Sequence, residues 1–444
     1  MVSVSGVRGI VGRDLTPDLV ARFAAAFGVL AAQAGRPSVV LARDARTSGP
    51  MFAAAARAGL QSVGCEVIDC GLIPTPTAQL AVEHHGAGGG IVLTASHNPI
   101  EWNALKFVGP DGVFLDADTG ARLLALVEGD IPRAAWDRVG EVRKDDGAVA
   151  RHLDRLLALP DLDVAAIRRR RFGVALDCVR GAGGTIMPRL LEALGCRVEV
   201  INGQTDGRFP RPPEPVPEHL GDLGAAVRRA GAQVGIAVDP DVDRLALVDE
   251  TGAAIGEDYT LAFAVEAVLR RRRGPVVVNL STSLVVDDAA RAFGVPVQRA
   301  PVGEANVARA MRVAHAVVGG EGNGGVMLPA LHLGRDAPVA AALVLDLLAT
   351  DAAGIAARVA ARPRYAIVKA KAPRGPDLSA VYRALEARFG DAAPDRQDGL
   401  RLAWPDRWLH VRPSGTEPIV RLIAEAPSRA DADALVAAAR DVLG

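Results

Sequence analysis

Three segments of the chain repeat one pattern of apolar and polar positions. Each begins with a continuous apolar run, passes through a polar or glycine-rich turn, and continues into an alanine- and leucine-rich stretch before a second apolar run; the segments are 38–71, 172–203 and 275–303. Continuous apolar strands that alternate with helices are typical of largely parallel sheets covered by helices on both faces. The repeated pattern therefore predicts three similar α/β domains with mixed sheets.

The C-terminal part of the chain follows a different order. From residue 363 onward the pattern predicts a strand, a helix, three further strands and a closing helix. Strands in succession indicate an antiparallel sheet, here in an α+β domain. The predicted domains are 1–145, 146–250 and 251–362, which are α/β, and 363–444, which is α+β.

Composition and charge narrow the function classes. The chain has 444 residues, 50% of them hydrophobic, and a formal net charge of −1, which predicts no nucleic-acid partner. The arginine runs at 168–171 and 270–273 are interpreted as solvated helix ends. The longest apolar tract, 339–349, is too short to cross a bilayer, and residues 1–12 lack the apolar core of a secretion signal. We therefore expect a cytoplasmic protein with no membrane partner and with reduced cysteines.

The strongest chemical signal is the stretch VGIAVDPDVDRLALVDE at 234–250. An apolar strand runs into Asp239, Asp241 and Asp243, whose carboxylates repel one another unless a cation neutralises them. All-oxygen ligands suit Mg²⁺ or Ca²⁺, and Mg²⁺ is commonly completed by phosphate oxygens and water. An EF-hand is disfavoured because Arg244 stands where that loop requires glycine, and a solvated acidic turn is the alternative. The loop predicts a magnesium site that meets a phosphate.

A second signal is RPSGTEP at 412–418, which lies between two apolar strands. Backbone N–H groups and hydroxyls of a Ser-Gly-Thr turn can point at one anion, and neighbouring arginines can add paired donors. A hairpin turn without a ligand would need only the glycine and the proline. The additional residues favour a phosphate-binding loop made by Arg412, Ser414, Gly415, Thr416 and Arg421.

A third signal is VVGGEGNGGVMLP at 317–329. Its glycines allow the backbone to approach a ligand closely. They flank Glu321 and Asn323, which suit hydroxyl groups better than phosphate because a carboxylate repels an anion. A flexible linker is the alternative, but the stretch directly follows an apolar strand. The pattern favours a polyol-binding loop.

Two glycine- and arginine-containing turns give weaker signals. They are SGVRGIVG, which contains Arg8, and LARDARTSG, which contains Arg43. Such turns are common, so these two arginines are only plausible anion contacts.

The stretch GIVLTASHNP at 90–99 ends an apolar strand on Ser96 and His97. A serine hydrolase would need a separate histidine held by a third group, and the G-x-S-x-G elbow is absent from this stretch. A structural serine turn is the other reading. A chain with a magnesium loop, a phosphate loop and a polyol loop nevertheless needs a group that gives and takes phosphate. Ser96 is the natural carrier.

The stretches TASHNP, DPDVDR, GGEGNGG and RPSGTEP occur in this order along the chain. Together they resemble the four motifs of the α-D-phosphohexomutase superfamily, which includes phosphoglucomutase, phosphomannomutase and phosphoglucosamine mutase. The resemblance covers essentially the whole chain and implies four domains around a central cleft, with one motif from each. It implies an isomerase that interconverts hexose 6-phosphate and hexose 1-phosphate through a phosphoserine and a bound hexose 1,6-bisphosphate.

The resemblance also implies roles for individual residues. Ser96 would carry the phosphoryl group beside His97 and would share the Mg²⁺ with the three aspartates. Lys106 would be the general acid or base, and Arg244 would lie close to the reacting phosphate. The substrate-binding residues would be Arg8, Arg43, Glu321, Asn323, Arg412, Ser414, Gly415, Thr416 and Arg421.

The chain departs from the family pattern in the motifs themselves. Ala104 and Pro240 stand where glycine is usual, and Gly325 stands where many members have histidine. The GEGNGG form is similar to archaeal-type phosphoglucosamine mutases and phosphomannomutase/phosphoglucomutases. The expected partner is a hexose phosphate, foremost glucosamine phosphate, bound by a monomer or homodimer. A metal-dependent phosphatase and a non-catalytic sugar-phosphate binder are the alternatives.

Overall fold

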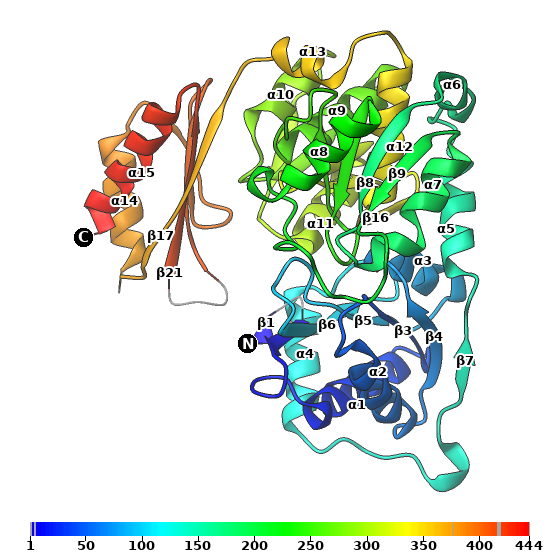
Figure 1. The fold of residues 1–444 in the computed structure, drawn as a ribbon. Helices are drawn as coiled ribbons and strands as arrows, with labels where there is room; N and C mark the ends of the chain where they lie inside the picture. Colours follow the sequence, from blue (N-terminus) through cyan, green and yellow to red (C-terminus); the bar gives the residue numbers. More distant parts are fainter. Residues whose placement is uncertain (1, 4–5, 376, 415–418, 444) are drawn as a thin grey trace.

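Four sheets divide the chain into four domains, named I to IV in chain order (Figure 1). The computed structural model describes residues 2–3, 6–375, 377–414 and 419–443. The largest cluster of buried apolar side chains runs from domain I through domain II into domain III, whereas domain IV has a core of its own. Domains I to III therefore form one packed body, to which domain IV is attached.

Domain I is built on a seven-stranded mixed sheet. Its strands are β1 Val2–Ser3, β2 Gly6–Ile10, β3 Ser38–Arg43, β4 Glu66–Leu72, β5 Gly90–Leu93, β6 Trp102–Val108 and β7 Val142–Lys144. Its helices are α1 Pro17–Gln33, α2 Gly49–Gln61, α3 Thr75–His85 and α4 Ala117–Glu128, with a short 3₁₀ turn at Trp136–Arg138. Strand β3 pairs in parallel with β4 and β5, whereas β6 pairs antiparallel with both β5 and β2.

Domain II follows two linking helices, α5 Ala148–Leu157 and α6 Val164–Arg170. Its strands are β8 Gly173–Asp177, β9 Arg197–Ile201, β10 Val234–Val238 and β11 Leu245–Val248. Its helices are α7 Met187–Ala193 and α8 Gly221–Ala230, with 3₁₀ turns at Ala182–Thr185 and Pro217–His219. The central strands β8 and β10 are parallel and completely buried, and β11 returns antiparallel to β10.

Domain III has a five-stranded sheet in the order β13-β12-β14-β15-β16. Its strands are β12 Val276–Asn279, β13 Val297–Ala300, β14 Val318–Glu321, β15 Gly325–Leu328 and β16 His332–Arg335. Its helices are α9 Asp258–Arg271, α10 Leu284–Arg291, α11 Glu304–Ala314, α12 Ala337–Ala349 and α13 Ile355–Ala360. Asp336 caps the start of α12 by accepting from the N–H of Val339, and this apolar helix is buried over nearly its whole length.

Domain IV is the predicted α+β domain, with an antiparallel sheet in the order β17-β21-β20-β19-β18. Its strands are β17 Ala366–Pro373, β18 Ala393–Asp395, β19 Leu400–Ala403, β20 Trp408–Pro413 and β21 Ile419–Ala426. Its helices are α14 Leu378–Arg388 and α15 Arg429–Leu443. Both helices lie on the outer face of the sheet, so the opposite face is turned toward the other domains (Figure 1).

Domain IV is tied to domain III through a buried carboxylate and an imidazole. Glu425 accepts from the N–H of Leu284 at 2.9 Å and from the hydroxyl of Ser283, both at the start of α10. His410 Nδ1 lies 2.8 Å from Ser281 Oγ, and its Nε2 lies 2.7 Å from the carbonyl oxygen of Asp398. The described attachment therefore includes polar contacts at the start of α10 and a further one at Val302, whose N–H donates to Asp398 Oδ2 at 3.1 Å.

Stability is expected to fall at mildly acidic pH because of His410. Burial lowers the pKa of this imidazole from 6.5 to about 4. Below pH 6.5 the imidazole binds a proton in the unfolded chain but not in the folded chain. The contribution of His410 to the free energy of unfolding is therefore complete above pH 6.5 and is lost as the pH falls toward 4. At pH 5 the loss is about 2 kcal/mol. Thermal unfolding of wild type and His410→Gln at pH 7 and pH 5 tests this; equal pH dependence of the two proteins contradicts it.

The fold class predicted from the sequence is confirmed: three mixed-sheet α/β domains precede an α+β domain. Both arginine runs lie at helix ends, one at the end of α6 and the other across the end of α9, as interpreted. All four cysteines are free thiols; Cys196 is half-buried and the other three are buried. None of the described helices combines the length and the apolar composition that a membrane crossing needs.

Candidate active site

Ser96 lies in a buried turn directly after β5. Its φ of +49° is the left-handed conformation, which is uncommon for a residue with a Cβ. The turn is held by its own polar network: the N–H of Ser96 donates to Thr94 Oγ1 at 2.9 Å, and its carbonyl accepts from Arg46 Nη2 at 2.6 Å. Arg46 also donates to the carbonyls of Asn98 and Pro99. The buried Arg46 guanidinium therefore fixes the loop that presents the serine hydroxyl.

The three aspartates follow β10 and converge on one point. Val242 has a φ of +65°, a strained conformation for a β-branched residue, within the turn that gathers them. One carboxylate oxygen from each of Asp239, Asp241 and Asp243 lies within 4.8 Å of the other two. Asp241 Oδ1 and Asp243 Oδ1 are buried and have no hydrogen-bond partner among the described residues. Orphaned carboxylate oxygens in a buried acidic cluster fit a divalent cation.

The serine of domain I and the aspartates of domain II are in direct contact. Ser96 Oγ donates to Asp239 Oδ2 at 2.7 Å. Thr75 Oγ1, at the start of α3, donates to Asp241 Oδ2 at 2.7 Å. The structure thus brings together the predicted phosphoryl carrier and the predicted metal loop.

Lys106 projects from β6 into the same cluster. Its Nζ lies 2.7 Å from Asp241 Oδ2 and 3.4 Å from Asp243 Oδ2. Burial alone would lower the pKa of the ammonium group, but the two carboxylates outweigh it and raise the pKa above its usual value. The two carboxylates therefore hold Lys106 in its protonated form.

The aspartates do not share their charge evenly. Burial, followed by repulsion from Asp243 and Asp241, raises the pKa of Asp239 well above its usual value. For Asp241 burial acts in the same direction, but Lys106 outweighs it and holds the pKa below its usual value. The repulsion that remains at Asp239 is what a bound cation would relieve.

His97 and Arg244 flank the serine on the side of Glu214. His97 Nδ1 lies 3.4 Å from Ser96 Oγ, and Arg244 Nη1 donates to Glu214 Oε1 at 3.3 Å. The charge of Arg244, followed by burial, lowers the pKa of His97 to about 2. His97 is therefore a neutral imidazole, and Arg244 is the cation that lies beside it.

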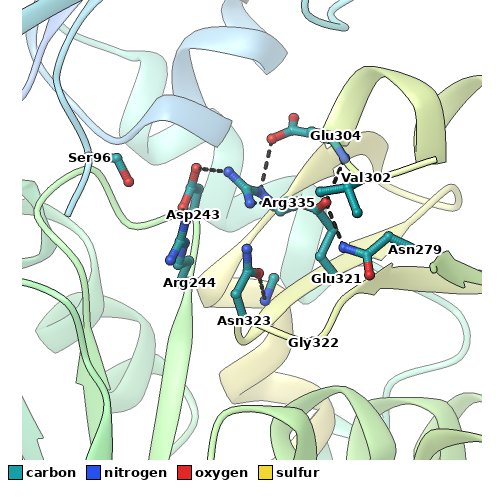
Figure 2. Close-up of polar contacts among 12 residues, drawn as sticks. Ser96, Asp243, Arg244, Asn279, Val302, Glu304, Glu321, Gly322, Asn323 and Arg335 are labelled. Carbon is teal, nitrogen blue, oxygen red and sulfur yellow. Dashed lines mark hydrogen bonds and ion pairs between the residues drawn. The ribbon is translucent and has the colours of Figure 1, made fainter. Parts of the chain in front are cut away.

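The predicted polyol loop joins this cluster through a side chain that the sequence analysis did not select. Glu321, at the end of β14, accepts from Asn279 Nδ2 at 2.8 Å and from Arg335 Nη1 at 2.7 Å. Arg335 Nη2 donates to Asp243 Oδ2 at 2.5 Å, so one guanidinium contacts both loops (Figure 2). Asn323 Oδ1 accepts from the N–H of Gly325 at 3.2 Å, and this bond stabilises the turn between β14 and β15.

The predicted phosphate loop belongs to domain IV, and its described contacts are local. Arg412 Nε donates to Asp398 Oδ2 at 2.8 Å, and Arg412 pairs with Arg421 across β20 and β21. Ser414 is buried at the end of the described part of the loop. Two further predicted residues, Gly415 and Thr416, lie outside the described residues. A phosphate role for this loop stays a prediction.

The two weaker candidates lie in strands rather than turns. Arg8 belongs to β2, and its Nη1 donates to Asn98 Oδ1 at 2.6 Å, next to the serine turn. Arg43 ends β3, and its Nη1 donates to the carbonyl of Asp44 at 3.1 Å. The position of Arg8 suits an anion contact better than that of Arg43. The guanidinium that supports the serine turn is Arg46.

Sequence reasoning missed Arg335, Glu304 and Asn279, and it did not commit to Arg46. Arg335 stands between an apolar strand and the apolar helix α12. An arginine in such surroundings is rarely buried without carboxylate partners, which is a usable signal. The partners themselves come from three elements far apart in sequence.

Family comparisons agree with this arrangement. The four domain families of phosphoglucomutase/phosphomannomutase match in order: α/β/α domains I, II and III match residues 2–132, 150–252 and 256–365, and the C-terminal domain matches residues 368–442. The chain belongs to the α-D-phosphohexomutase superfamily. It is therefore an isomerase of the phosphohexomutase class.

Two archaeal relatives illustrate the similarity in sequence. A phosphoglucomutase/phosphomannomutase of Thermococcus kodakarensis is 39% identical over 95% of this chain and 94% of its own. A probable phosphoglucosamine mutase of Methanopyrus kandleri is 37% identical over 96% of this chain and 93% of its own. Members of the superfamily with different substrate names are thus almost equally similar to this one.

Solved structures share the whole architecture. A phosphoglucomutase/phosphomannomutase family protein from Burkholderia thailandensis superposes with a TM-score of 0.87 at 28% identity, covering 100% of this chain and 98% of that one. A putative phosphomannomutase from Thermus thermophilus gives a TM-score of 0.84 at 26% identity, covering 99% and 98%.

Proposed function

We propose that this phosphohexomutase converts glucosamine 6-phosphate to glucosamine 1-phosphate through phospho-Ser96 and a bound 1,6-bisphosphate. The observation that carries the mechanism is the contact of Ser96 Oγ with the aspartate triad, 2.7 Å from Asp239 Oδ2. A phosphoserine carries a charge of about −1.5 to −2, which needs the neutralisation such a site supplies. Phosphomannomutase/phosphoglucomutase activity is the second candidate, supported by the 39% identical relative.

Asp239, Asp241 and Asp243 would hold Mg²⁺, because their buried and partly unpartnered oxygens suit a hard cation. When bound, the ion supplies charge neutralisation for phosphoryl transfer. The chain's own groups would contribute the rest: Arg244 is the cation beside His97, and the protonated Lys106 would supply the proton.

In the proposed transfer, the bond between phosphorus and Ser96 Oγ breaks while a bond to a free sugar hydroxyl forms. The serine oxygen gains a proton from Lys106, and the neutral lysine amine that results takes up the proton that the attacking hydroxyl loses. Lys106 thus returns to its starting state, and the step is proton-neutral overall. The bisphosphate then presents its other phosphoryl group, and the reverse transfer restores phospho-Ser96. A positioned proton donor contributes about 10²–10⁴-fold to such a rate.

Parallel assays with the 6-phosphates of glucosamine, glucose and mannose test the substrate assignment. Each assay contains Mg²⁺ and the matching 1,6-bisphosphate, and it measures the 1-phosphate formed. We expect the highest kcat/KM with glucosamine 6-phosphate. A higher value with glucose or mannose 6-phosphate selects the second candidate. Release of inorganic phosphate without isomer formation contradicts the proposed shuttle.

A further inference from the structure

Arg335, the last residue of β16, is a buried cation that joins three elements. Its guanidinium donates to Asp243 Oδ2 at 2.5 Å, to Glu304 Oε2 at 3.0 Å and to Glu321 Oε2 at 2.7 Å (Figure 2). These carboxylates belong to the aspartate loop of domain II, to the start of α11 and to the end of β14. The planar fork of a guanidinium can hold several acceptors in fixed directions, which an ammonium cannot.

The contacts of Glu321 leave little freedom for its carboxylate. Oε1 accepts from Asn279 Nδ2 at 2.8 Å and from the N–H of Gly303 at 2.9 Å, and Oε2 accepts from Arg335. Each carboxylate oxygen has two acceptor directions. Both directions of Oε1 are used, so Oε2 is the oxygen with one direction left. Although burial opposes it, Arg335 holds the pKa of Glu321 below its usual value, which keeps the group ionised.

The place occupied by Arg335 depends on Gly325. A Cβ at position 325 would lie 2.3 Å from Arg335 Cδ and 3.0 Å from Arg335 Cγ. Such distances are far inside van der Waals contact, so a side chain at 325 and the observed Arg335 conformation exclude each other. The absence of a side chain at position 325 therefore provides the space that the Arg335 stem fills.

We propose that Arg335 is a positioning residue for the sugar: it orients Glu321 so that Oε2 accepts one hydroxyl of the hexose. Gly325 leaves the room that this arrangement requires. The inference rests on the proposed function, because it takes a hexose phosphate to lie against the loop of Glu321. The role is distinct from phosphoryl transfer, since Arg335 acts through another side chain.

The test compares one hexose 1-phosphate with its singly deoxygenated analogues, using whichever of the three sugars the wild type converts fastest. A hydrogen bond to a carboxylate predicts that one analogue loses about 10- to 100-fold in kcat/KM. In Arg335→Met we expect the ratio of kcat/KM for the parent sugar to kcat/KM for that analogue to fall to near 1. We also expect KM for the parent sugar to rise. A folding defect lowers the active fraction equally for all substrates, so it leaves the ratio unchanged.

Gly325→Ala provides a second route to the same result, because its Cβ displaces the Arg335 stem. We expect it to reduce the ratio as Arg335→Met does, and the double variant to be no worse than Arg335→Met alone. Gly221→Ala is the matched control, since a Cβ there meets nothing within 4 Å. An unchanged ratio in Arg335→Met overturns the inference.

Calorimetric binding of the same sugars to Ser96→Ala enzyme, with and without Arg335→Met, separates this inference from the proposed function. If the Ser96→Ala enzyme binds the parent sugar more tightly than the deoxygenated analogue, and Arg335→Met removes this difference in affinity, the result supports the inference even if the wild type shows no mutase turnover. Mutase turnover combined with discrimination that Arg335→Met does not change contradicts the inference alone. A wild type that binds none of the hexose phosphates contradicts both.

Discussion

Ser96→Ala is expected to abolish interconversion of hexose phosphates and to remove a mass of about 80 Da, one phosphoryl group, from the purified protein. The alanine keeps the backbone conformation at φ +49° but removes the oxygen that contacts Asp239 at 2.7 Å. No other described hydroxyl bonds to that carboxylate, so the phosphoryl group has no alternative carrier at this position. Coupled mutase assays and intact-mass spectrometry measure the two effects.

The matched control is Ser62→Ala in the same domain, which removes a hydroxyl that donates to the carbonyl of Gly59 and accepts from Arg133. It should retain wild-type turnover and the added mass. Retained turnover in Ser96→Ala, with a thermal unfolding curve like that of wild type, would refute the carrier role.

Asp241→Asn is expected to remove the dependence of activity on Mg²⁺ and to lower kcat/KM by at least about 100-fold. Asp241 is central to the cluster: Oδ2 accepts from Lys106 and Thr75 at 2.7 Å each, and Oδ1 is buried without a partner among the described residues. The substitution removes one negative charge and replaces one carboxylate oxygen by a nitrogen that cannot bind a cation, and it also weakens the ion pair with Lys106. Titration of activity with Mg²⁺, and of the protein with paramagnetic Mn²⁺, gives both readouts.

Asp222→Asn, on the exposed first turn of α8, serves as the control because it carries no contact with the cluster. It should leave the Mg²⁺ response and the Mn²⁺ affinity at wild-type values. If Asp241→Asn binds Mn²⁺ as tightly as the control does, the aspartate loop is not the metal site.

The sequence was sufficient to predict the parts of the site that are local. Asp239, Asp241 and Asp243 follow one strand at alternate positions, so their convergence after β10 required only a turn. The position of Ser96 was predictable for the same reason, because it lies in the turn that follows the buried strand β5. In mixed α/β sheets the ends of neighbouring strands meet, and residues placed there share a site.

The parts that could not be predicted depend on packing between distant elements. Arg335, Glu304 and Asn279 come from β16, α11 and β12. No spacing along the chain indicates that Arg335 contacts Glu304 or that Asn279 contacts Glu321. Arg8 was predicted to lie in a turn, but it lies in strand β2. The cause is similar, because antiparallel pairing with β6 fixes this strand rather than its own residues. Propensity is a weak signal where tertiary pairing decides.

The mutual exclusion between a side chain at 325 and the Arg335 stem has a consequence for how this protein can evolve. Acquiring a bulkier residue at 325 first would expel the arginine and leave Asp243, Glu304 and Glu321 without their shared cation. Losing the arginine first would do the same before any replacement exists. A change at either position alone therefore removes the same cation from the cluster, so the effect of a side chain at 325 depends on which residue stands at 335.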